Sequence, residues 1–410
     1  MRILISAYAC EPDKGSEPFL GWRWSNEIAK HNEVWVITRT NNRDAIERYL
    51  AEKPNENFHF VYVDVDGLIG KYKKGQRGIQ VYYYFWQKQA YKKAKELMND
   101  IEFDIVHHLT FGAFTQPTFM YKLGIPFIWG PLGGGEKLPY IQGRRIDLKS
   151  TIYEIARIVQ MYVYRALPCT RGALKGASKI LVTTEDTLKL IPRKYHEKTE
   201  IFQSLGIDDD FISETDEPKE KDEKIRVLMV GRMISWKGFD LGIEAFVKAA
   251  KRNSNIELYL RGNGELKKQL FAQVGELMNQ RVHYVDTFFP YGEMHQFYKG
   301  FDIFLNCSLH DSGCLALLEA MSAGLPIVCV DTGGPHVITN DDNAIKIKPT
   351  DKELLTDKLC EALLQLCEDE NRRVEMGKES KRIIKDEYRY DRKYNHLKEI
   401  YEEVVGTISR

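Results

Sequence analysis

Short apolar runs alternate with longer segments of mixed polarity along most of this chain. The short runs are rich in Ile, Val, Leu and Phe, which is typical of strands buried on both faces of a sheet. In the longer segments, apolar residues recur three and four positions apart, as on one face of a helix. Strands that alternate with helices in this way predict an α/β fold with parallel sheets covered by helices.

The predicted strands form two series. The first comprises 2–9, 33–39, 58–65, 103–109, 126–130, 179–184 and 199–205, and the second comprises 225–231, 256–262, 281–285, 302–308, 326–331 and 344–349. Residues 206–224 lie between the two series and are dense in charge and poor in apolar side chains, which is typical of a linker. From about Lys352 the pattern is helical, and the last helix is expected to begin near Asp391.

The length supports the same division, because 410 residues are about twice or three times the usual size of one domain. We predict a first Rossmann-like domain at 1–205, a second at 206–385, and a C-terminal helix at 386–410 that packs back on the first. Ligands of doubly wound sheets bind at the carboxyl ends of the strands. A cleft between two such domains is therefore the expected site.

The composition narrows the classes of function. Acidic and basic residues balance at 59 each, which argues against a protein held on nucleic acid by phosphate charge. The seven cysteines include no C-x-x-C pair, as expected of a reduced cytoplasmic protein. The first strand follows the start of the sequence without a leader pattern, and no run of about 18 apolar residues could span a bilayer.

The loop "GRMISWKG", Gly231 to Gly238, lies between a predicted strand and a predicted helix. Free backbone N–H groups and the helix dipole make such a loop an anion site. Arg232 and Lys237 would add two full charges, and the glycines would let the backbone approach a diphosphate. A solvated loop with two ordinary surface cations is the alternative.

A second informative segment, "LHDSGCLALLEAMSAGLPIVCVDTGGP", covers residues 309–335. If a helix starts near Gly313, Asp311 lies at its mouth and Glu319 two turns in, so both carboxylates could accept hydrogen bonds from sugar and ribose hydroxyls. An N-cap Asp and a Glu at the edge of the core are the alternative. The turn "TGGP" would let backbone amides approach a phosphate.

The ordered set "GR....KG", "RGNGEL", "D.......EAMSAG.PIV" and "DTGG" resembles the carboxyl-terminal half of the retaining glycosyltransferases of family 4, which have the GT-B fold. The resemblance spans essentially the entire chain, since "SLGIDDDF" at 204–211 is similar to the family's entry into its second domain. It implies a hexosyl transfer from a nucleoside-diphosphate-sugar donor to an acceptor hydroxyl, in cell-surface polysaccharide or glycolipid synthesis, with retention at the anomeric carbon.

The resemblance also implies roles for individual residues on the donor side. Arg232 and Lys237 match the pair that holds the donor's diphosphate, and Glu319 matches the acid expected at the ribose hydroxyls. Asp311 stands where the family usually has a Glu that contacts the transferred sugar, and it is one methylene shorter. The residues that follow it, Gly313, Cys314 and Leu315, would also meet the donor.

The first domain would hold the acceptor and complete the site. His107 and His108 end a predicted strand where the family uses a histidine near the reacting centre, and only one of two adjacent strand residues can face a cleft. Gly15 and Ser16 would lie near the diphosphate. Glu136 follows three glycines; we favour a solvated loop acid over an acceptor-side base.

No metal or other cofactor is expected, because cationic side chains and helix ends replace magnesium in this fold. The donor would be of UDP or GDP type, and the acceptor a saccharide or lipid-linked saccharide. Residues 71–100 mix cations with Tyr83, Tyr84 and Trp86, and 144–168 adds a further basic and aromatic stretch. Peripheral contact with the inner membrane face, binding of an acidic polysaccharide, and a buried helix with a solvated basic face all fit.

Two other classes of protein remain open. A sugar-nucleotide epimerase of the same fold would bind the same donor and release a free sugar. A catalytically impaired nucleotide-sugar-binding protein would result if Asp311 has lost activity. A dinucleotide-dependent oxidoreductase fits less well, because no G-x-G-x-x-G follows the first strand.

Overall fold

The computed structural model describes residues 1–12, 14–15, 17–65, 67, 75, 78–212, 224–287, 289 and 293–406. The chain forms two compact units. Unit 1 comprises Met1–Gly135, Arg157–Ser204 and Tyr390–Arg410, and unit 2 comprises Glu136–Ala156 and Leu205–Arg389. The chain therefore passes from one unit to the other after residues 135, 156, 204 and 389.

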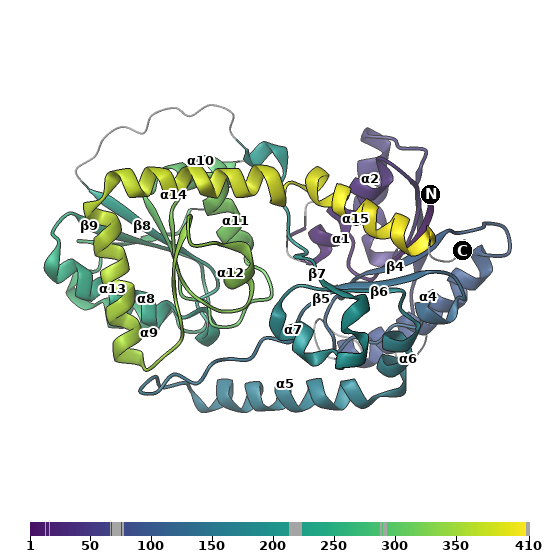
Figure 1. Cartoon of the computed structure of the whole chain (residues 1–410), viewed down its shortest axis with the longest axis horizontal. Helices are drawn as coiled ribbons and strands as arrows, with labels where there is room; N and C mark the ends of the chain where they lie inside the picture. The colour runs from purple at the N-terminus through teal and green to yellow at the C-terminus, as the bar shows by residue number, and fades with distance from the viewer. Residues whose placement is uncertain are drawn as a thin grey trace. The chain divides into compact units, whose positions relative to one another are not determined.

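Unit 1 contains a parallel sheet of seven strands in the order β3-β2-β1-β4-β5-β6-β7. The strands are β1 (Arg2–Ala7), β2 (Glu33–Arg39), β3 (Phe58–Val63), β4 (Ile105–Thr110), β5 (Phe127–Leu132), β6 (Lys179–Val182) and β7 (Thr199–Ile201). Its helices are α1 (Glu17–Ala29), α2 (Arg43–Glu52), α4 (Ile79–Leu97), α6 (Pro168–Gly176), α7 (Glu185–Leu190) and α15 (Tyr390–Gly406). Helices α1, α2 and α15 cover one face of this sheet, and α4, α6 and α7 cover the other (Figure 1).

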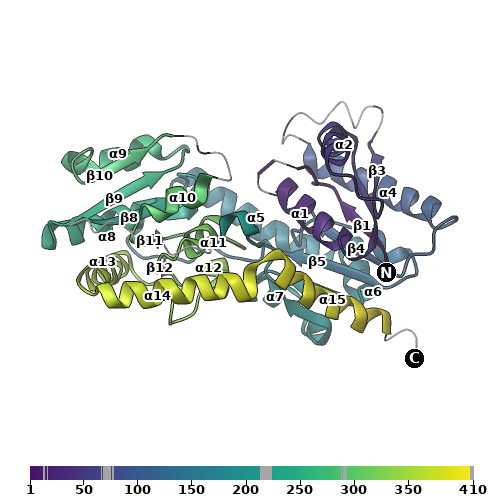
Figure 2. The same cartoon turned by 90° about the horizontal axis from the view of Figure 1, so that it is seen from above.

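Unit 2 contains a parallel sheet of six strands in the order β10-β9-β8-β11-β12-β13. The strands are β8 (Ile225–Val230), β9 (Ile256–Arg261), β10 (Val282–Val285), β11 (Ile303–Asn306), β12 (Ile327–Val330) and β13 (Ala344–Ile347). Its helices are α8 (Phe239–Arg252), α9 (Lys267–Val274), α10 (Met294–Lys299), α11 (Leu315–Ser322), α12 (Gly333–Ile338), α13 (Lys352–Glu368) and α14 (Glu370–Ile383). Helices α8, α9 and α13 pack on one face, and α10 and α11 pack on the other (Figure 2).

The predicted fold class is confirmed, because both sheets are parallel and covered by helices on both faces. Every strand predicted from the apolar runs is present, and β2 has the predicted bounds. Several strands end earlier than predicted; β7, for example, ends at Ile201. The apolar runs identify strands here because central strands of both sheets, such as β4, β5, β11 and β12, are buried on both faces.

The prediction of a linker at 206–224 is wrong for its first residues. Ile207 and Phe211 are fully buried in the core of unit 2. The Ile207 N–H donates a hydrogen bond at 2.8 Å to the carbonyl of Tyr388, the last residue of a π-helical turn at Ile384–Tyr388. This part of unit 2 thus begins at Leu205, just before the charged stretch, and 213–223 lie outside the described residues.

The aromatic stretch expected at a membrane or a polysaccharide is mostly part of the core. Tyr83 and Trp86 of α4 are fully buried, and Trp86 Nε1 donates to the Val63 carbonyl at 2.8 Å. For α4 the structure agrees with the alternative of a buried helix, and residues 71–74, 76 and 77 lie outside the description. None of the helices in the described ranges is long and apolar enough to cross a membrane.

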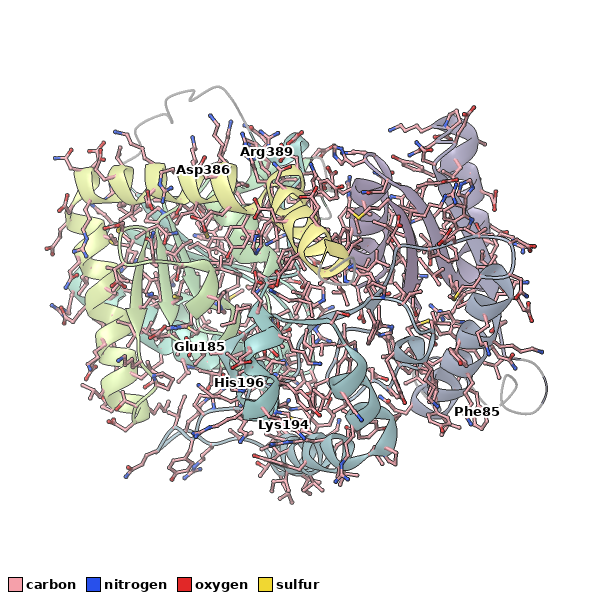
Figure 3. The ribbon with its side chains drawn as sticks, turned by 45° about the vertical axis from the view of Figure 1, so that its right-hand side comes forward. Phe85, Glu185, Lys194, His196, Asp386 and Arg389 are labelled. Carbon is pink, nitrogen blue, oxygen red and sulfur yellow. The ribbon has the colours of Figure 1, made fainter. Side chains whose placement is uncertain are left out.

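Helix α5 (Leu148–Ala166) begins in the segment Glu136–Ala156, which groups with unit 2, and ends in unit 1. No pattern in the sequence indicates that this segment leaves the first unit. Figure 3 labels Asp386 and Arg389, which are among the last residues of unit 2 along the chain. After Arg389 the chain returns to unit 1 and enters α15.

Candidate functional site

The central point of the unit 2 sheet lies between β8 and β11, where the strand order reverses. Sheets of this type bind ligands at the carboxyl ends of the two strands that flank such a reversal. The loop 231–238 leaves β8 and enters α8, and the loop 307–314 leaves β11 and enters α11. The turn that follows β12 leads into α12. These three connections form the candidate site within unit 2.

The loop after β8 and the loop after β11 contact each other through an ion pair between Lys237 and Asp311. Lys237 Nζ lies 2.6 Å from Asp311 Oδ2, and the Ser308 hydroxyl donates to the same oxygen at 2.7 Å. The side chains of Lys237 and Asp311 are 19% and 15% exposed. Burial lowers the pKa of Lys237, but the charge and hydrogen bond of Asp311 outweigh burial, so that the pKa is raised above its ordinary value. Lys237 is therefore a cation at neutral pH.

Arg232, the other cation of the β8 loop, is exposed. Within the described part of the chain its guanidinium has no hydrogen bond or ion pair. Its positive charge acts on Lys237, whose pKa it lowers slightly against the effect of Asp311. The loop thus offers one shielded cation and one open cation for an anion, with the amino-terminal end of α8 behind them.

Glycines allow the loops of the site to touch one another. Gly238 has φ = 63°, and a Cβ there would lie 2.1 Å from the Cys307 carbonyl oxygen. Gly333 has φ = 45°, and its Cβ would lie 2.3 Å from the Asp311 carbonyl oxygen. The Gly334 N–H donates to that same oxygen at 2.7 Å. Side chains at these positions would separate the loops.

These contacts change the interpretation of the turn "TGGP". We expected its amides to approach a phosphate, but the Gly334 N–H is already bonded to Asp311. The Thr332 hydroxyl donates to the Ser308 carbonyl at 2.8 Å. In the structure the turn therefore supports the backbone of the β11 loop, because the two connections pack directly against each other.

Glu319 lies on α11, which begins at Leu315, and Cys314 is its N-cap residue. The Glu319 side chain is buried, with 7% of the residue exposed, and its Oε2 accepts a hydrogen bond from the Tyr298 hydroxyl at 2.7 Å. Burial raises the pKa of Glu319, while Tyr298 and the positive charge of Arg261 oppose the rise. The sequence patterns include Glu319 and, at the start of "RGNGEL", Arg261, but they do not include Tyr298.

Cys314 and Gly313 contribute to the loop that precedes α11. Cys314 Sγ accepts a hydrogen bond from the Asn306 side chain at 3.0 Å, and burial raises the pKa of its thiol to about 11. The thiol is thus protonated at neutral pH. Gly313 packs against Gly334, where a Cβ would lie 2.9 Å from Gly313 Cα. Leu315 is partly buried against the core.

Arg144 is a supporting residue that the sequence did not indicate. Its guanidinium forms a bidentate ion pair with Asp240, in which both nitrogen–oxygen distances are 2.8 Å, and it also donates to the Ser235 carbonyl. The Arg144 side chain is only 3% exposed. It therefore fixes the β8 loop and the start of α8, although it lies 96 positions before Asp240.

An aromatic pair also lies on the β8 loop. The Trp236 ring stacks on the Tyr153 ring of α5 with centroids 6.1 Å apart and planes at 11°. A large aromatic side chain inside a loop that is expected to bind an anion is a signal that could have been found in the sequence. It adds an apolar surface beside the two cations.

The two histidines of unit 1 do not end their strand, because β4 continues through Leu109 to Thr110. His107 and His108 point to opposite faces of the sheet, as expected, and both are fully buried. His107 Nδ1 lies 2.7 Å from the Tyr401 hydroxyl, and its Nε2 lies 2.7 Å from the Gly130 carbonyl oxygen.

His108 lies against the opposite set of partners. Its Nε2 is 3.3 Å from the Tyr83 hydroxyl, and its Nδ1 is 3.3 Å from the Ser6 hydroxyl. Burial lowers the pKa of His107 to about 4 and that of His108 to about 3, so both rings are neutral. Both histidines therefore have the packed environment that the sequence left open for one of them.

The first loop of unit 1 follows β1, which pairs with β4 at the reversal of its sheet. Gly15 is exposed, and no atom lies within 4 Å of the position of a Cβ. Ser16 is outside the described residues. Glu17 accepts a hydrogen bond from the Gly112 N–H at 2.9 Å, and burial raises the pKa of its carboxyl.

Glu136 is not a solvated loop acid, because only 2% of the residue is exposed. It groups with unit 2, where its Cγ would lie 3.3 Å from a Cβ on Gly333. The three glycines before it gave the expectation of an open loop. The chain instead packs Glu136 beside the turn that follows β12.

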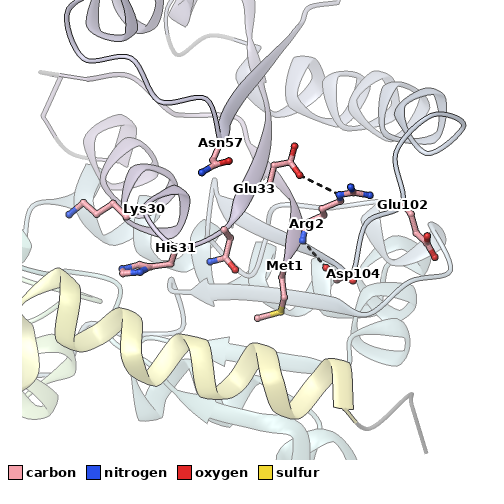
Figure 4. Close-up of a pocket in the computed structure, with 9 residues that line it drawn as sticks. Met1, Arg2, Lys30, His31, Glu33, Asn57, Glu102 and Asp104 are labelled. Carbon is pink, nitrogen blue, oxygen red and sulfur yellow. Dashed lines mark hydrogen bonds and ion pairs between the residues drawn. The ribbon is translucent and has the colours of Figure 1, made fainter.

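A pocket in unit 1 lies where the strands of its sheet begin (Figure 4). Arg2 and Glu33, where β1 and β2 start, line it together with Asp104, which precedes β4. The Arg2 N–H donates to Asp104 Oδ2 at 2.7 Å, and Arg2 Nε lies 3.3 Å from Glu33 Oε2. These charges are paired and lie at the amino ends of the strands. Ligands in such sheets bind at the carboxyl ends instead.

Comparisons with known proteins concern the family and the fold. Residues 210–383 match the family model of the glycosyl transferases group 1. A glycosyltransferase of Methanocaldococcus jannaschii, MJ1069, is 28% identical over 211 residues, which cover 50% of this chain and 53% of that protein. The alpha-monoglucosyldiacylglycerol synthase of Streptococcus pneumoniae is 21% identical over 264 residues, which cover 61% of this chain and 56% of that protein. The chain thus spans little more than half the length of these two curated relatives.

The fold comparison covers nearly the whole chain. The crystal structure of Anabaena Alr3699/HepE in complex with UDP superposes with a TM-score of 0.66 at 13% sequence identity, over 98% of this chain and 100% of that chain. Two parallel, doubly wound units and this likeness confirm the predicted GT-B fold. The chain therefore has the GT-B fold, and its residues 210–383 match the group 1 glycosyltransferases.

Proposed function

We propose that the protein transfers a hexosyl group from a UDP- or GDP-type sugar to a hydroxyl of a saccharide or lipid-linked saccharide, in the synthesis of a cell-surface polysaccharide or glycolipid. The observation that carries the proposal is the Lys237–Asp311 pair at the carboxyl ends of β8 and β11, 2.6 Å long and only partly exposed. A cation and a carboxylate in one site suit a substrate with a diphosphate next to a sugar. The UDP bound to HepE supports a uridine nucleotide as the first donor to test.

The donor's diphosphate would lie between Lys237 and Arg232, in front of the amino terminus of α8. Charge-assisted hydrogen bonds contribute about 1.5–3 kcal/mol each, and they strengthen as negative charge builds on the leaving diphosphate. When the donor binds, Lys237 exchanges the Asp311 carboxylate for a phosphate oxygen. Asp311 can then accept a hydrogen bond from a hydroxyl of the transferred sugar.

Glu319 would accept hydrogen bonds from the ribose hydroxyls, with its Oε2 already oriented by Tyr298. We propose that the acceptor hydroxyl attacks the anomeric carbon from the face that the diphosphate leaves, so that configuration is retained. The departing phosphate oxygen takes the proton of that hydroxyl. His107 and His108 have no acid–base role in this proposal, since both are neutral and enclosed.

The cationic groups of the site take the part that a magnesium ion plays in other transferases. We therefore propose that the reaction needs no metal or other cofactor. Transfer should continue at an unchanged rate in excess chelator, and a loss of rate that magnesium restores would contradict this point.

The test of the donor site is a thermal-shift titration of the full chain with UDP, GDP and ADP. A nucleotide that binds the folded state raises the melting temperature, because it stabilises by RT ln(1 + [L]/Kd). We expect Lys237→Ala to weaken nucleotide binding at least tenfold, since one charge-assisted contact of about 1.5–3 kcal/mol is lost. Arg232→Ala should act in the same direction.

Lys268→Ala is the matched control, because Lys268 is an exposed lysine on α9 of the same unit. It should bind the nucleotide like the unchanged protein. The site would be refuted if nucleotide raised the melting temperatures of the Lys237 and Arg232 variants as much as that of the unchanged protein. Turnover of the donor only in the presence of an acceptor separates a transferase from an epimerase and from a binding protein.

A further inference from the structure

Helix α5 presents a row of large apolar side chains to solvent. Six residues spaced three and four apart, with one adjacent pair, are between 48% and 75% exposed: Leu148, Ile152, Ile155, Val159, Tyr162 and Val163. This spacing places them on one face of the helix. We call this row the α5 stripe.

Two charged side chains of α5 are turned toward the protein instead. Glu154 accepts a hydrogen bond from the Leu138 N–H at 3.1 Å, and Arg157 donates to the Gly134 carbonyl at 3.0 Å. A surface helix normally places its apolar face on the core and its polar face in water. In α5 this order is reversed for most of the helix, and only Met161 is fully buried.

The exposure is concentrated on this helix. Of the thirteen large apolar side chains that are exposed within the described residues, seven belong to α5, including Tyr153. Scattered apolar residues on a surface need no explanation, but a contiguous apolar patch marks an interaction site.

A basic cavity of about 610 Å³ adjoins the carboxyl-terminal end of α5 in unit 1. Tyr162 belongs both to the stripe and to the wall of this cavity. The described residues that line it include four cations and no acid: Arg165, Arg171, Lys175 and Lys194. The side chain of Lys194 is labelled in Figure 3, and its ammonium group lies 4.9 Å from the centre of the Tyr195 ring.

We propose that α5 docks the protein on an anionic lipid bilayer. The α5 stripe would enter the boundary between headgroups and acyl chains, and the basic cavity would receive a lipid phosphate. Amphipathic helices with aromatic and aliphatic side chains on one face and cations beside it bind membranes in this way. The membrane contact that the sequence suggested at 71–100 is thereby assigned to α5, because the rings of Tyr83 and Trp86 are buried.

A second copy of this chain fits the patch less well. A two-fold contact sets the same patch of both copies against itself. The four cations of the cavity would then need acidic partners within the same patch of the other copy, and the described residues that line the cavity include no acid. A surface of negative lipid headgroups satisfies both the charge and the apolar stripe.

The test is flotation of the full chain with phosphatidylcholine vesicles that contain or lack phosphatidylglycerol. We expect the protein to float with the anionic vesicles and to remain unbound with pure phosphatidylcholine. The double variant Ile155→Glu, Val159→Glu should reduce binding at least tenfold, because two charges would enter the apolar boundary. The double variant Arg171→Glu, Lys175→Glu should also bind anionic vesicles more weakly, and its binding should depend less on salt concentration.

The matched control is Leu354→Glu with Val374→Glu, which changes two exposed apolar residues of α13 and α14. It should float like the unchanged protein. Circular dichroism shows whether the variants are folded, and Ile155→Asn replaces the double variant if that one unfolds. Flotation needs no donor, so its result is independent of the proposed transfer reaction.

Three results would overturn the inference. The unchanged protein could fail to float with anionic vesicles, or the folded stripe variant could float equally well. Light scattering could also show a dimer that the stripe variant separates into monomers, without vesicle binding by either protein. In that last case a second copy is the occupant of the stripe.

Discussion

Lys237 and Asp311 neutralise each other in the ligand-free site, so each limits what the other can bind. A phosphate oxygen that approaches Lys237 comes within a few ångströms of the Asp311 carboxylate, where like charges repel. Donor binding must therefore offset the loss of an ion pair. The sugar hydroxyls compensate for part of this loss if they donate to Asp311.

This competition leads to a prediction for Asp311→Asn. The variant should bind free UDP or GDP as tightly as the unchanged protein or several-fold more tightly, because the repulsion is removed. Sugar transfer should fall about 100-fold, as expected when a group that acts mainly on the reacting sugar is lost. Calorimetric titration and a transfer assay measure the two effects separately. Weaker nucleotide binding with unchanged transfer would contradict the assignment.

At the scale of single residues, the sequence identified residues in the loops that follow strands and one residue on the helix α11 that follows such a loop. Arg232, Lys237 and Glu319 belong to short patterns, so local spacing finds them. Arg144 and Tyr298 could not be found in this way, because they act on residues that are distant in sequence. Their roles depend on which loops the fold brings together.

Helix α15 is joined to β4 by a buried hydrogen bond between His107 and Tyr401. His108 lies on the opposite face of the same strand, against α4. Both rings are neutral in the folded unit, whereas in the unfolded chain they would take up protons near their ordinary pKa of about 6.5. The contacts on both faces of β4 thus favour the uncharged form.

The two histidines predict a loss of stability in mild acid. Their folded pKa values of about 4 and about 3 are depressed, so below about pH 6.5 the unfolded chain binds more protons than the folded one. Each ring can then cost about 1.4 kcal/mol of unfolding free energy for each pH unit, down to its folded pKa. Urea unfolding at pH 7.5, 6 and 5 measures this change.

His107→Asn is the variant that tests the origin of the effect. It removes one titrating ring, so its stability should depend less steeply on pH between 6.5 and 5. An unchanged slope would show that other groups cause the acid sensitivity. Tyr401→Phe should cost about 1–3 kcal/mol at neutral pH, because a buried ring nitrogen loses its partner.

The presence of each strand was easier to predict from the sequence than the burial of individual side chains. Buried parallel strands have a clear apolar pattern, which is why each predicted strand is present. The same pattern does not report which neighbour covers a side chain. It therefore missed the burial of Ile207 in the supposed linker and of Glu136 after the three glycines.

The whole molecule contains two units, each with apolar cores on both faces of its own sheet. Unit 1 depends on α15 for one of these cores. Six apolar residues of α15 are buried there: Tyr390, Tyr394, Leu397, Ile400, Tyr401 and Val404. At about 1.5–3 kcal/mol for each side chain, their burial is comparable to the whole stability of a typical domain, about 5–15 kcal/mol.

A chain that ends at Arg389 should therefore lose the cooperative unfolding of unit 1 and bind a hydrophobic dye. Calorimetry should retain a transition for unit 2, and UDP or GDP should still raise its temperature. Adding a peptide of residues 390–406 should restore part of the unit 1 signal. A shortened chain with an unchanged near-ultraviolet circular dichroism spectrum would contradict this dependence.

The path of the chain through the two units has a consequence for biosynthesis. Residues emerge from the ribosome in order, but unit 1 needs segments from both halves of the sequence. Trp24 and Phe202 have no partner on α15 until Tyr390 and the residues after it have been translated. The nascent amino-terminal half must then be kept from aggregating while almost two hundred further residues are synthesised.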